Sequence, residues 1–278
     1  RRRHTRSFHV TGVQTCALPI CVVISAGSFN VQNPWSRLVA LMVFMPVVRF
    51  GEAANPGPDD AIFVLGTANP SGLRSKAPFV ASQMAHGDMW AFSETHLCSR
   101  ELSSFNAGLK FAESPFAPMI GGFPVPVSRD NTGAWKGVGV LSRTPVRHVP
   151  QDWPTEIAQS SRIMIMTSLI DSFWLTGSVV YGEPDSKHYP LRLQHTEALL
   201  QAAIASVGYL SSGPRFIAGD WNVGQGELPA FDALAQLGFK DLQDLATERW
   251  GISPKMTCKS RTRKDFCYVS PELQELLL

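Results

Sequence analysis

The sequence predicts an α/β sandwich with a functional site at one rim. Short apolar runs bounded by turn residues alternate with longer amphipathic stretches, which indicates a mixture of buried strands and helices. Several of the apolar runs end in a carboxylate or a carboxamide. Strand ends meet at the rim of a sheet, so polar side chains repeated there indicate a binding or catalytic site.

The composition is that of an ordinary globular protein. The chain has 278 residues, of which 44% are hydrophobic and 17% are charged, and this length suits one large domain or two small ones. Its formal charge of +2 includes four arginines among the first six residues, so overall charge does not indicate a nucleic-acid partner. The five cysteines have neither a CxxC pair nor zinc-site spacing, and they are expected to be free thiols or small core residues.

The N-terminal segment is predicted to be foreign to the domain. Residues 10–20 (VTGVQTCALPI) resemble the in-frame translation of a sequencing adapter over their whole length. Residues 1–20 are therefore interpreted as an artefact of sequence assembly and excluded from fold reasoning, as an expression tag would be.

Residues 21–60 are predicted to be a leader and linker that is disordered or loosely packed. Within them, the apolar run 38–48 is too short to span a bilayer, and it is either a helix packed on the domain or a segment without native structure. The Pro, Gly and Asp residues of 52–60 indicate a linker. The main domain is therefore predicted to comprise residues 61–278.

Two buried strands are predicted in the first part of this domain, and each delivers a polar residue. The apolar run at residues 61–66 leads to Asn69. After a predicted helix at 75–87, a second apolar run at 89–97 contains Glu94. Both residues can ligate a metal or form hydrogen bonds.

The middle of the domain is predicted to contain three strands and a helix. Residues 137–143 form a strand punctuated by glycines, and residues 162–169 and 173–181 form a strand pair around a short turn. The second strand of this pair ends in Tyr181. Residues 191–207 carry an apolar stripe with helical spacing and are the clearest helix.

Residues 216–223 (FIAGDWNV) carry the strongest chemical signal. Asp220 and Asn222 would point to the same side if the backbone stayed extended. The carboxylate could then orient or deprotonate a water, and the amide could donate to a developing oxyanion. The alternative is that both residues only cap or turn the chain after a strand. Trp221, between them, is expected to pack in the core.

The C-terminal part is predicted to contain a helix at 229–237 and a last strand at 264–270 that carries Asp265. A basic loop precedes this strand, and it could either hold a phosphate backbone or be a solvated loop. Its basic residues are Lys255, Lys259, Arg261, Arg263 and Lys264.

Taken in order, these motifs resemble the endonuclease/exonuclease/phosphatase superfamily over roughly residues 60–278. The most similar subgroup is the endonuclease domain of non-LTR retrotransposons. Its first-acid motif resembles the stretch Ser93-Glu94-Thr95-His96-Leu97, and the Asn-x-x-Gly-Leu-Arg pattern that begins at Asn69 also fits. The resemblance implies a four-layered α/β sandwich, with two packed mixed β-sheets flanked by helices. It also implies hydrolysis of phosphoester bonds with Mg²⁺ or Mn²⁺.

The resemblance further implies a role for each motif residue. Glu94 would be a metal ligand, and Asn69 would support the metal or the scissile phosphate. Tyr181 would hydrogen-bond the phosphate, Asp220 would orient the attacking water, and Asn222 would stabilise the transition state. Each of these residues also has a purely structural interpretation, as a turn former, a core residue or an ion-pair partner.

Two departures from the family pattern affect the expected activity. Some members carry a second acid two residues after the first-strand Asn, and this sequence has Ser71 there. The retrotransposon domains also lack that acid, so this departure favours the subgroup. The family ends in a Ser-Asp-His stretch on a final strand, and Asp265 would orient the histidine that it carries. None of the seven histidines here lies in such a context. The last strand is therefore expected to be missing and the chain to be inactive or nearly so, because losing such a group costs on the order of 10²–10³ in rate.

Three functions stay open from the sequence. The first is a DNA-nicking endonuclease of a retrotransposon, which would act in the nucleus. The second is another phosphoesterase of the superfamily, such as an abasic-site repair nuclease or a phosphatase of lipids or small molecules. The third is a non-catalytic remnant that at most binds nucleic acid. DNA is the expected partner, and neither a membrane nor an obligate protein partner is expected.

Overall fold

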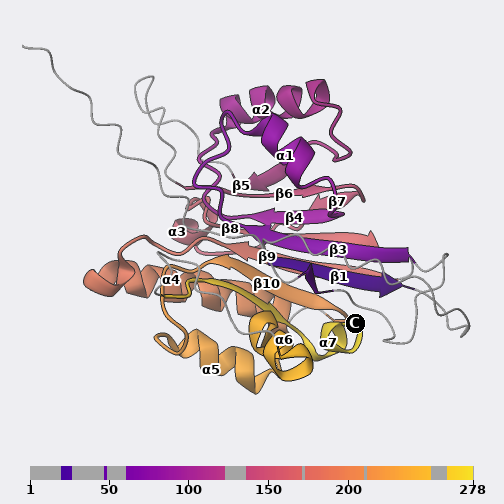
Figure 1. Cartoon of the computed structure of the whole chain (residues 1–278). Coiled ribbons are helices and arrows are strands. Elements are labelled where there is room, and N and C mark those ends of the chain that lie inside the picture. The colour runs from indigo at the N-terminus through magenta and orange to yellow at the C-terminus, as the bar shows by residue number, and fades with distance from the viewer. Residues whose placement is uncertain are drawn as a thin grey trace, which may run out of the picture.

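The computed structural model describes residues 20–26, 47–48, 61–122, 136–170, 173–209, 212–251 and 262–277. Two mixed β-sheets lie face to face between two layers of helices (Figure 1). This arrangement confirms the predicted α/β sandwich of four layers. None of the helices in the described part of the chain is long and apolar enough to cross a membrane.

The first sheet has the strand order β2-β1-β3-β4-β6-β5. In its centre, β3 and β4 run parallel, so the residues that follow these two strands leave the sheet at the same edge. The strands of this sheet are β1 (Ile20–Ala26), β2 (Val47–Val48), β3 (Ala61–Ala68), β4 (Met89–Phe92), β5 (Ile120–Gly122) and β6 (Val138–Ser142).

The second sheet has the strand order β11-β12-β10-β9-β8-β7. Its central strand β10 is parallel to β9 and antiparallel to β12. The strands are β7 (Val146–His148), β8 (Ile163–Ile170), β9 (Phe173–Val180), β10 (Arg215–Asp220), β11 (Lys240–Asp241) and β12 (Asp265–Val269).

The helices cover the outer faces of the two sheets (Figure 1). α1 (Ala77–Gln83) and α2 (Ser99–Phe111) lie over the first sheet. The remaining helices follow strands of the second half of the chain. They are α3 (Thr155–Ala158), the 3₁₀ turn η1 (Ser186–His188), α4 (Pro190–Ala203) with its π-helical continuation η2 (Ile204–Tyr209), α5 (Pro229–Gln236), α6 (Leu242–Trp250) and α7 (Pro271–Glu275).

Three apolar clusters hold the layers together. The inter-sheet cluster joins residues of both sheets, among them Leu65, Met164 and Phe216, each at most 2% exposed. A second cluster packs the other face of the second sheet against α4 and α5. A third packs the first sheet against α1 and α2. Burial of this kind is the main favourable contribution to folding, at roughly 25 cal/mol per Å² of apolar surface.

The predicted elements are present, and the largest differences occur at strand ends. The strands predicted at 89–97 and 216–223 end earlier, at Phe92 and Asp220. The elements that were not predicted in the main domain include the helices α2, α3, α6 and α7 and the short strands β5, β7 and β11. Trp221 is fully buried, as predicted.

The N-terminal predictions are only partly covered by the described residues. β1 begins at Ile20, the last residue of the predicted artefact, and its other residues and β2 fall within the predicted leader. β1 pairs antiparallel with β3. Residues 1–19 and most of the apolar run 38–48 lie outside the described part of the chain. The proposed division into artefact, leader and domain therefore stays a prediction. Cys98 and Cys267, the cysteines whose side chains are described, are free and buried.

Candidate active site

The two motifs that follow β3 and β4 bind each other through their backbones. The amide of Gly72 donates to the carbonyl of Glu94 at 2.9 Å, and the amide of Leu73 donates to the carbonyl of Thr95 at 2.8 Å. Gly72 has a φ of +95°, a conformation that glycine adopts without steric cost. These bonds fix where the Asn69 and Glu94 side chains leave the sheet.

The Asn69 amide forms a bridge between two carboxylates on different sheets. Its Nδ2 donates to Glu94 Oε2 at 2.7 Å and to Asp220 Oδ2 at 2.7 Å. Its Oδ1 accepts from the backbone amide of Ser71 at 2.9 Å, which fixes the orientation of the amide group. Three residues predicted to belong to the site are therefore brought together.

Burial dominates the ionisation of Asp220. It raises the pKa of this carboxyl from 3.8 to about 6. Hydrogen bonds from the Asn222 backbone and the Asn69 side chain lower the pKa, the charge of Glu94 raises it further, and the charge of Lys264 lowers it. Asp220 is therefore close to its titration point near neutral pH, which suits a group that exchanges a proton with water.

Asn222 does not sit as the sequence suggested. Its φ is +56°, so the extended geometry that would put it on the same side as Asp220 is wrong. Its backbone amide donates to Asp220 Oδ1 at 2.9 Å, the type of local bond that Asp makes in turns. Its side-chain Nδ2 donates to the carbonyl of Gly182 at 3.1 Å. The carboxamide is thus bound to the backbone of the segment that follows β9.

Tyr181 follows β9 and is 3% exposed. Burial raises the pKa of its phenol above the ordinary value, and the charges of Glu94 and Asp220 raise it further, whereas Arg162 lowers it. The hydroxyl therefore stays protonated and can donate a hydrogen bond. The backbone amide of Gly182, the next residue, donates to the carbonyl of Asp220 at 2.8 Å, which holds Tyr181 near the site.

Asp265 is the first residue of β12 and lies directly opposite Asp220 in the antiparallel pairing. Directly opposed residues share one face of a sheet, so the two acids lie on the same side. Asp265 is 6% exposed. Its predicted role, orienting a histidine, stays a prediction.

The predicted nucleic-acid contacts are only partly described. Lys255, Lys259 and Arg261 lie outside the described residues. Arg263 has a 9% exposed side chain and forms ion pairs with Asp241 at 2.5 Å and Asp244 at 3.3 Å, which tie α6 to β12. Its guanidinium is engaged inside the protein, whereas Lys264 is partly exposed and lies close enough to influence Asp220.

No role was predicted for His96, Arg162 or Glu183. His96 Nε2 lies 3.1 Å from Glu94 Oε1, so each oxygen of that carboxylate has a neighbour. The position of His96, two residues after Glu94, was the available signal. Arg162 at a strand start and Glu183 in a loop carried no signal, because such residues are usually solvated.

The donor set partly fits a divalent cation. The carboxylates of Glu94 and Asp220 are hard oxygen donors of the kind that Mg²⁺ prefers. Asn69 presents its amide nitrogen to them, so direct ligation by its oxygen would require the amide to turn over. Among the described residues, no group of three or more His, Cys, Asp or Glu side chains is arranged to hold a metal ion.

Comparison with known proteins agrees with the fold. A profile described as the Endonuclease/Exonuclease/phosphatase family matches residues 27–273. A 3′-5′ exonuclease from Neisseria meningitidis is 16% identical with a TM-score of 0.52, over 73% of this chain and 85% of that one. The AP endonuclease LMAP from Leishmania major is 14% identical with a TM-score of 0.52, over 74% and 78%.

A retrotransposon domain is also among the similar structures. The endonuclease domain of TRAS1, a telomere-specific non-LTR retrotransposon, is 13% identical with a TM-score of 0.43, over 74% of this chain and 83% of that one. No curated protein sequence matches the chain. The exonuclease and the AP endonuclease, with TM-scores of 0.52, support the shared fold and no more at these identities.

Proposed function

Because the chain belongs to the endonuclease/exonuclease/phosphatase family, we propose that it is a divalent-metal-dependent phosphodiesterase domain that nicks DNA, as in a non-LTR retrotransposon. The observation that carries the proposal is the amide bridge from Asn69 to Glu94 and Asp220, since it assembles residues from both sheets into one polar site. The retrotransposon assignment is the finer part of the proposal, and it rests on the motif stretch around Glu94.

Each site residue has a proposed role that its surroundings support. Asp220, with a pKa raised to about 6, would orient and deprotonate the attacking water near neutral pH. Tyr181 keeps its phenol proton and would donate it in a hydrogen bond to the phosphate. Asn222 would donate to the transition state once its Nδ2 exchanges the Gly182 carbonyl for a phosphate oxygen.

Glu94 is the residue that would hold the cation, and Asn69 would support it. A bound Mg²⁺ or Mn²⁺ would neutralise charge that develops on the phosphate. Asn69 would keep the Glu94 carboxylate in place through its hydrogen bond, and the His96 ring, which lies 3.1 Å from the other carboxylate oxygen, would confine it from the other side. Lys264 and the basic loop before it are the proposed contacts to the DNA backbone.

The test is nicking of a supercoiled plasmid in Mg²⁺ by the wild-type chain, Asp220→Ala and Asp232→Ala. Asp232 is an exposed acid on α5 and serves as a matched control. We expect Asp220→Ala to fall to the background rate and Asp232→Ala to equal the wild type. Equal nicking by all three proteins would contradict the proposed site.

The absolute rate is expected to be low, because none of the seven histidines lies in a Ser-Asp-His context. Robust nicking that depends on Asp220 would refute this expectation and support the site. Release of phosphate from small esters without nicking would favour a phosphatase. Binding of DNA with no turnover would favour a non-catalytic remnant.

The cation site can be tested without any turnover, by following Mn²⁺ binding with electron paramagnetic resonance. We expect Glu94→Gln to weaken this binding.

A further inference from the structure

We propose that Arg162 and Glu183 form a positioning pair that holds Tyr181 in place for the reaction. The proposal rests on the proposed function, because it concerns a residue assigned to the phosphate. Neither member of the pair touches Glu94 or Asp220 in the described contacts, so their effect would pass through Tyr181.

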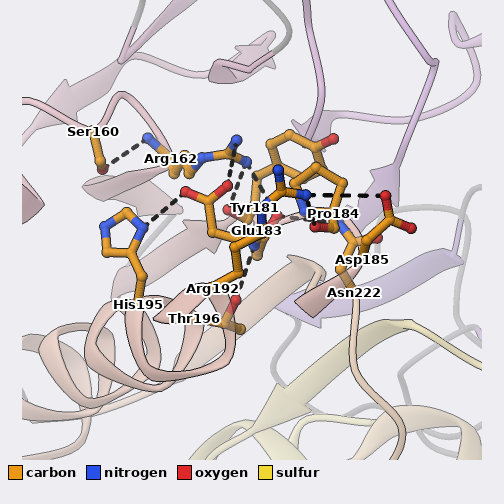
Figure 2. A network of polar contacts seen from close by, with 11 residues as sticks. Ser160, Arg162, Tyr181, Glu183, Pro184, Asp185, Arg192, His195, Thr196 and Asn222 are labelled. Atoms are coloured by element: carbon orange, nitrogen blue, oxygen red, sulfur yellow. Dashed lines mark hydrogen bonds and ion pairs between the residues drawn. The ribbon is translucent and has the colours of Figure 1, made fainter. Parts of the chain in front are cut away.

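Arg162 contacts the three consecutive residues that follow β9 (Figure 2). Its Nη1 donates to the carbonyl of Gly182 at 3.1 Å, and its Nη2 lies 2.9 Å from Glu183 Oε2. Its guanidinium carbon lies 4.7 Å from the centroid of the Tyr181 ring. In addition, the backbone amide of Tyr181 donates to the carbonyl of Arg162 at 2.7 Å. One side chain therefore fixes both the backbone and the ring of this segment.

Glu183 is in turn held by the first turns of α4. His195 Nδ1 lies 2.8 Å from Glu183 Oε1, and the Thr196 hydroxyl accepts from the backbone amide of Glu183 at 2.9 Å. Figure 2 shows Glu183 between the His195 ring and the Arg162 guanidinium, with the Tyr181 ring on the far side of the guanidinium. The line of contacts therefore runs from α4 through Glu183 and Arg162 to Tyr181.

The chemistry of the pair favours arginine over any other cation. A planar guanidinium can contact a carboxylate, a carbonyl and an aromatic face at once, which an ammonium cannot do. Arg162 is 7% exposed, and Glu183 supplies the opposite charge that such a buried cation requires. Lysine at this position would keep the charge and lose the simultaneous contacts.

The test compares Arg162→Lys with the wild type by two measurements. In the first, the four tyrosines are labelled with ¹³C in the ring, and the Tyr181 signal is assigned from its loss in Tyr181→Phe. We expect Arg162→Lys to shift or broaden the Tyr181 signal and to leave those of the exposed Tyr189 and Tyr209 unchanged. This measurement does not depend on turnover, so it stays informative if the proposed function fails.

The second measurement is the nicking rate. We expect Arg162→Lys to lower kcat on the order of 10- to 100-fold, because small displacements of a positioned group have effects of this size, and to change KM less than twofold. In the Tyr181→Phe background the same substitution should have no further effect on kcat, because the group that it positions is gone.

Arg215→Lys is the matched control. Arg215 is also buried, contacts Glu272 through Nη2 at 2.9 Å, donates to the Gly208 carbonyl at 2.9 Å and lies over the Phe239 ring. It lies at the opposite end of β10 from Asp220. Its substitution should lower stability without moving the Tyr181 signal or kcat.

An unchanged Tyr181 signal in Arg162→Lys would overturn the proposal, as would a full additional loss of kcat in the Tyr181→Phe background. If Arg162→Lys does not fold, Glu183→Gln gives the same test, since it keeps an acceptor for Arg162 and removes the charge. A Tyr181 signal unchanged in Glu183→Gln would likewise overturn the proposal.

Discussion

Asn69 shows how one neutral side chain can bring two acids together. Both hydrogens of its amide nitrogen are directed at carboxylates, while its oxygen accepts from Ser71. Asp220 accepts one of these bonds, yet burial still keeps the pKa of its carboxyl near 6. Ionised Asp220 is therefore destabilising in the metal-free fold, a usual cost of placing charge where chemistry requires it.

We predict that Asp220→Asn stabilises the metal-free protein more at pH 8 than at pH 4, by up to about 3 kcal/mol, since the pKa of Asp220 is about 6 in the fold against 3.8 as a reference. The folded pKa is raised, so this carboxyl lowers wild-type stability as pH rises from about 4 through 6. Below about pH 4 this additional gain should vanish. Urea unfolding at pH 4 and pH 8, with a chelator present, measures the change in the free energy of unfolding, and Asp232→Asn serves as the control. An equal gain at pH 4 and pH 8 would contradict the assignment.

At the level of elements, residues with a left-handed backbone conformation follow the strands that lead to the site. Glu94 and His96 after β4, and Asn222 after β10, have φ values of +55°, +52° and +56°. Such conformations are uncommon for residues other than glycine, and they turn the chain sharply at the rim. Within β10 itself, Gly219 has a φ of +140°, and a Cβ there would lie 1.9 Å from the Val180 carbonyl oxygen. β9 and β10 therefore approach closely just before Asp220.

We predict that Gly219→Ala lowers the free energy of unfolding by at least about 2 kcal/mol, through backbone strain and a clash with β9. Gly226→Ala separates these two causes, because Gly226 has a φ of +77° with open space around it. Gly226→Ala should lower the free energy of unfolding by only about 1 kcal/mol. Urea unfolding of both variants measures the difference, and equal costs would mean that the contact with Val180 relaxes.

The strands of four residues or more in the main domain were predicted, because their apolar runs are local signals, whereas the short strands β5, β7 and β11 were not. The sequence did not predict α2, in which Phe105 and Leu109 are the buried residues and the apolar stripe is therefore narrow. It placed Asn222 wrongly, because a left-handed turn after Asp220 depends on bonds to Gly182 and Ser186 from distant segments. The pairing of Arg162 with Glu183 likewise exists only in the folded chain.

At the level of the whole molecule, the site is divided between the two sheets. Asn69 and Glu94 follow strands of the first sheet, whereas Tyr181 follows a strand of the second sheet and Asp220 is the last residue of β10. The Ser93 hydroxyl, which accepts from the Asp220 amide at 3.3 Å, also crosses between them. Below these contacts, the inter-sheet cluster fills the space between the sheets, so the site geometry depends on how the sheets pack.

We predict that the two sheets unfold together and that Phe216→Ala lowers stability by about 3–5 kcal/mol, as truncation of a buried aromatic residue usually does. Phe216 is fully buried in the inter-sheet cluster. Far-ultraviolet circular dichroism and tryptophan fluorescence should give coincident urea midpoints that move together in the variant. Two separate transitions would show that the sheets are independent units.

The bond from Asn69 to Asp220 has a practical consequence for inhibition. It joins residues 151 positions apart and spans two layers that are otherwise held mainly by apolar contacts. A slide of one sheet over the other by little more than a hydrogen-bond length would separate the acids while leaving each half intact. A small apolar compound that separated the sheets would therefore inhibit the site without competing with its substrate.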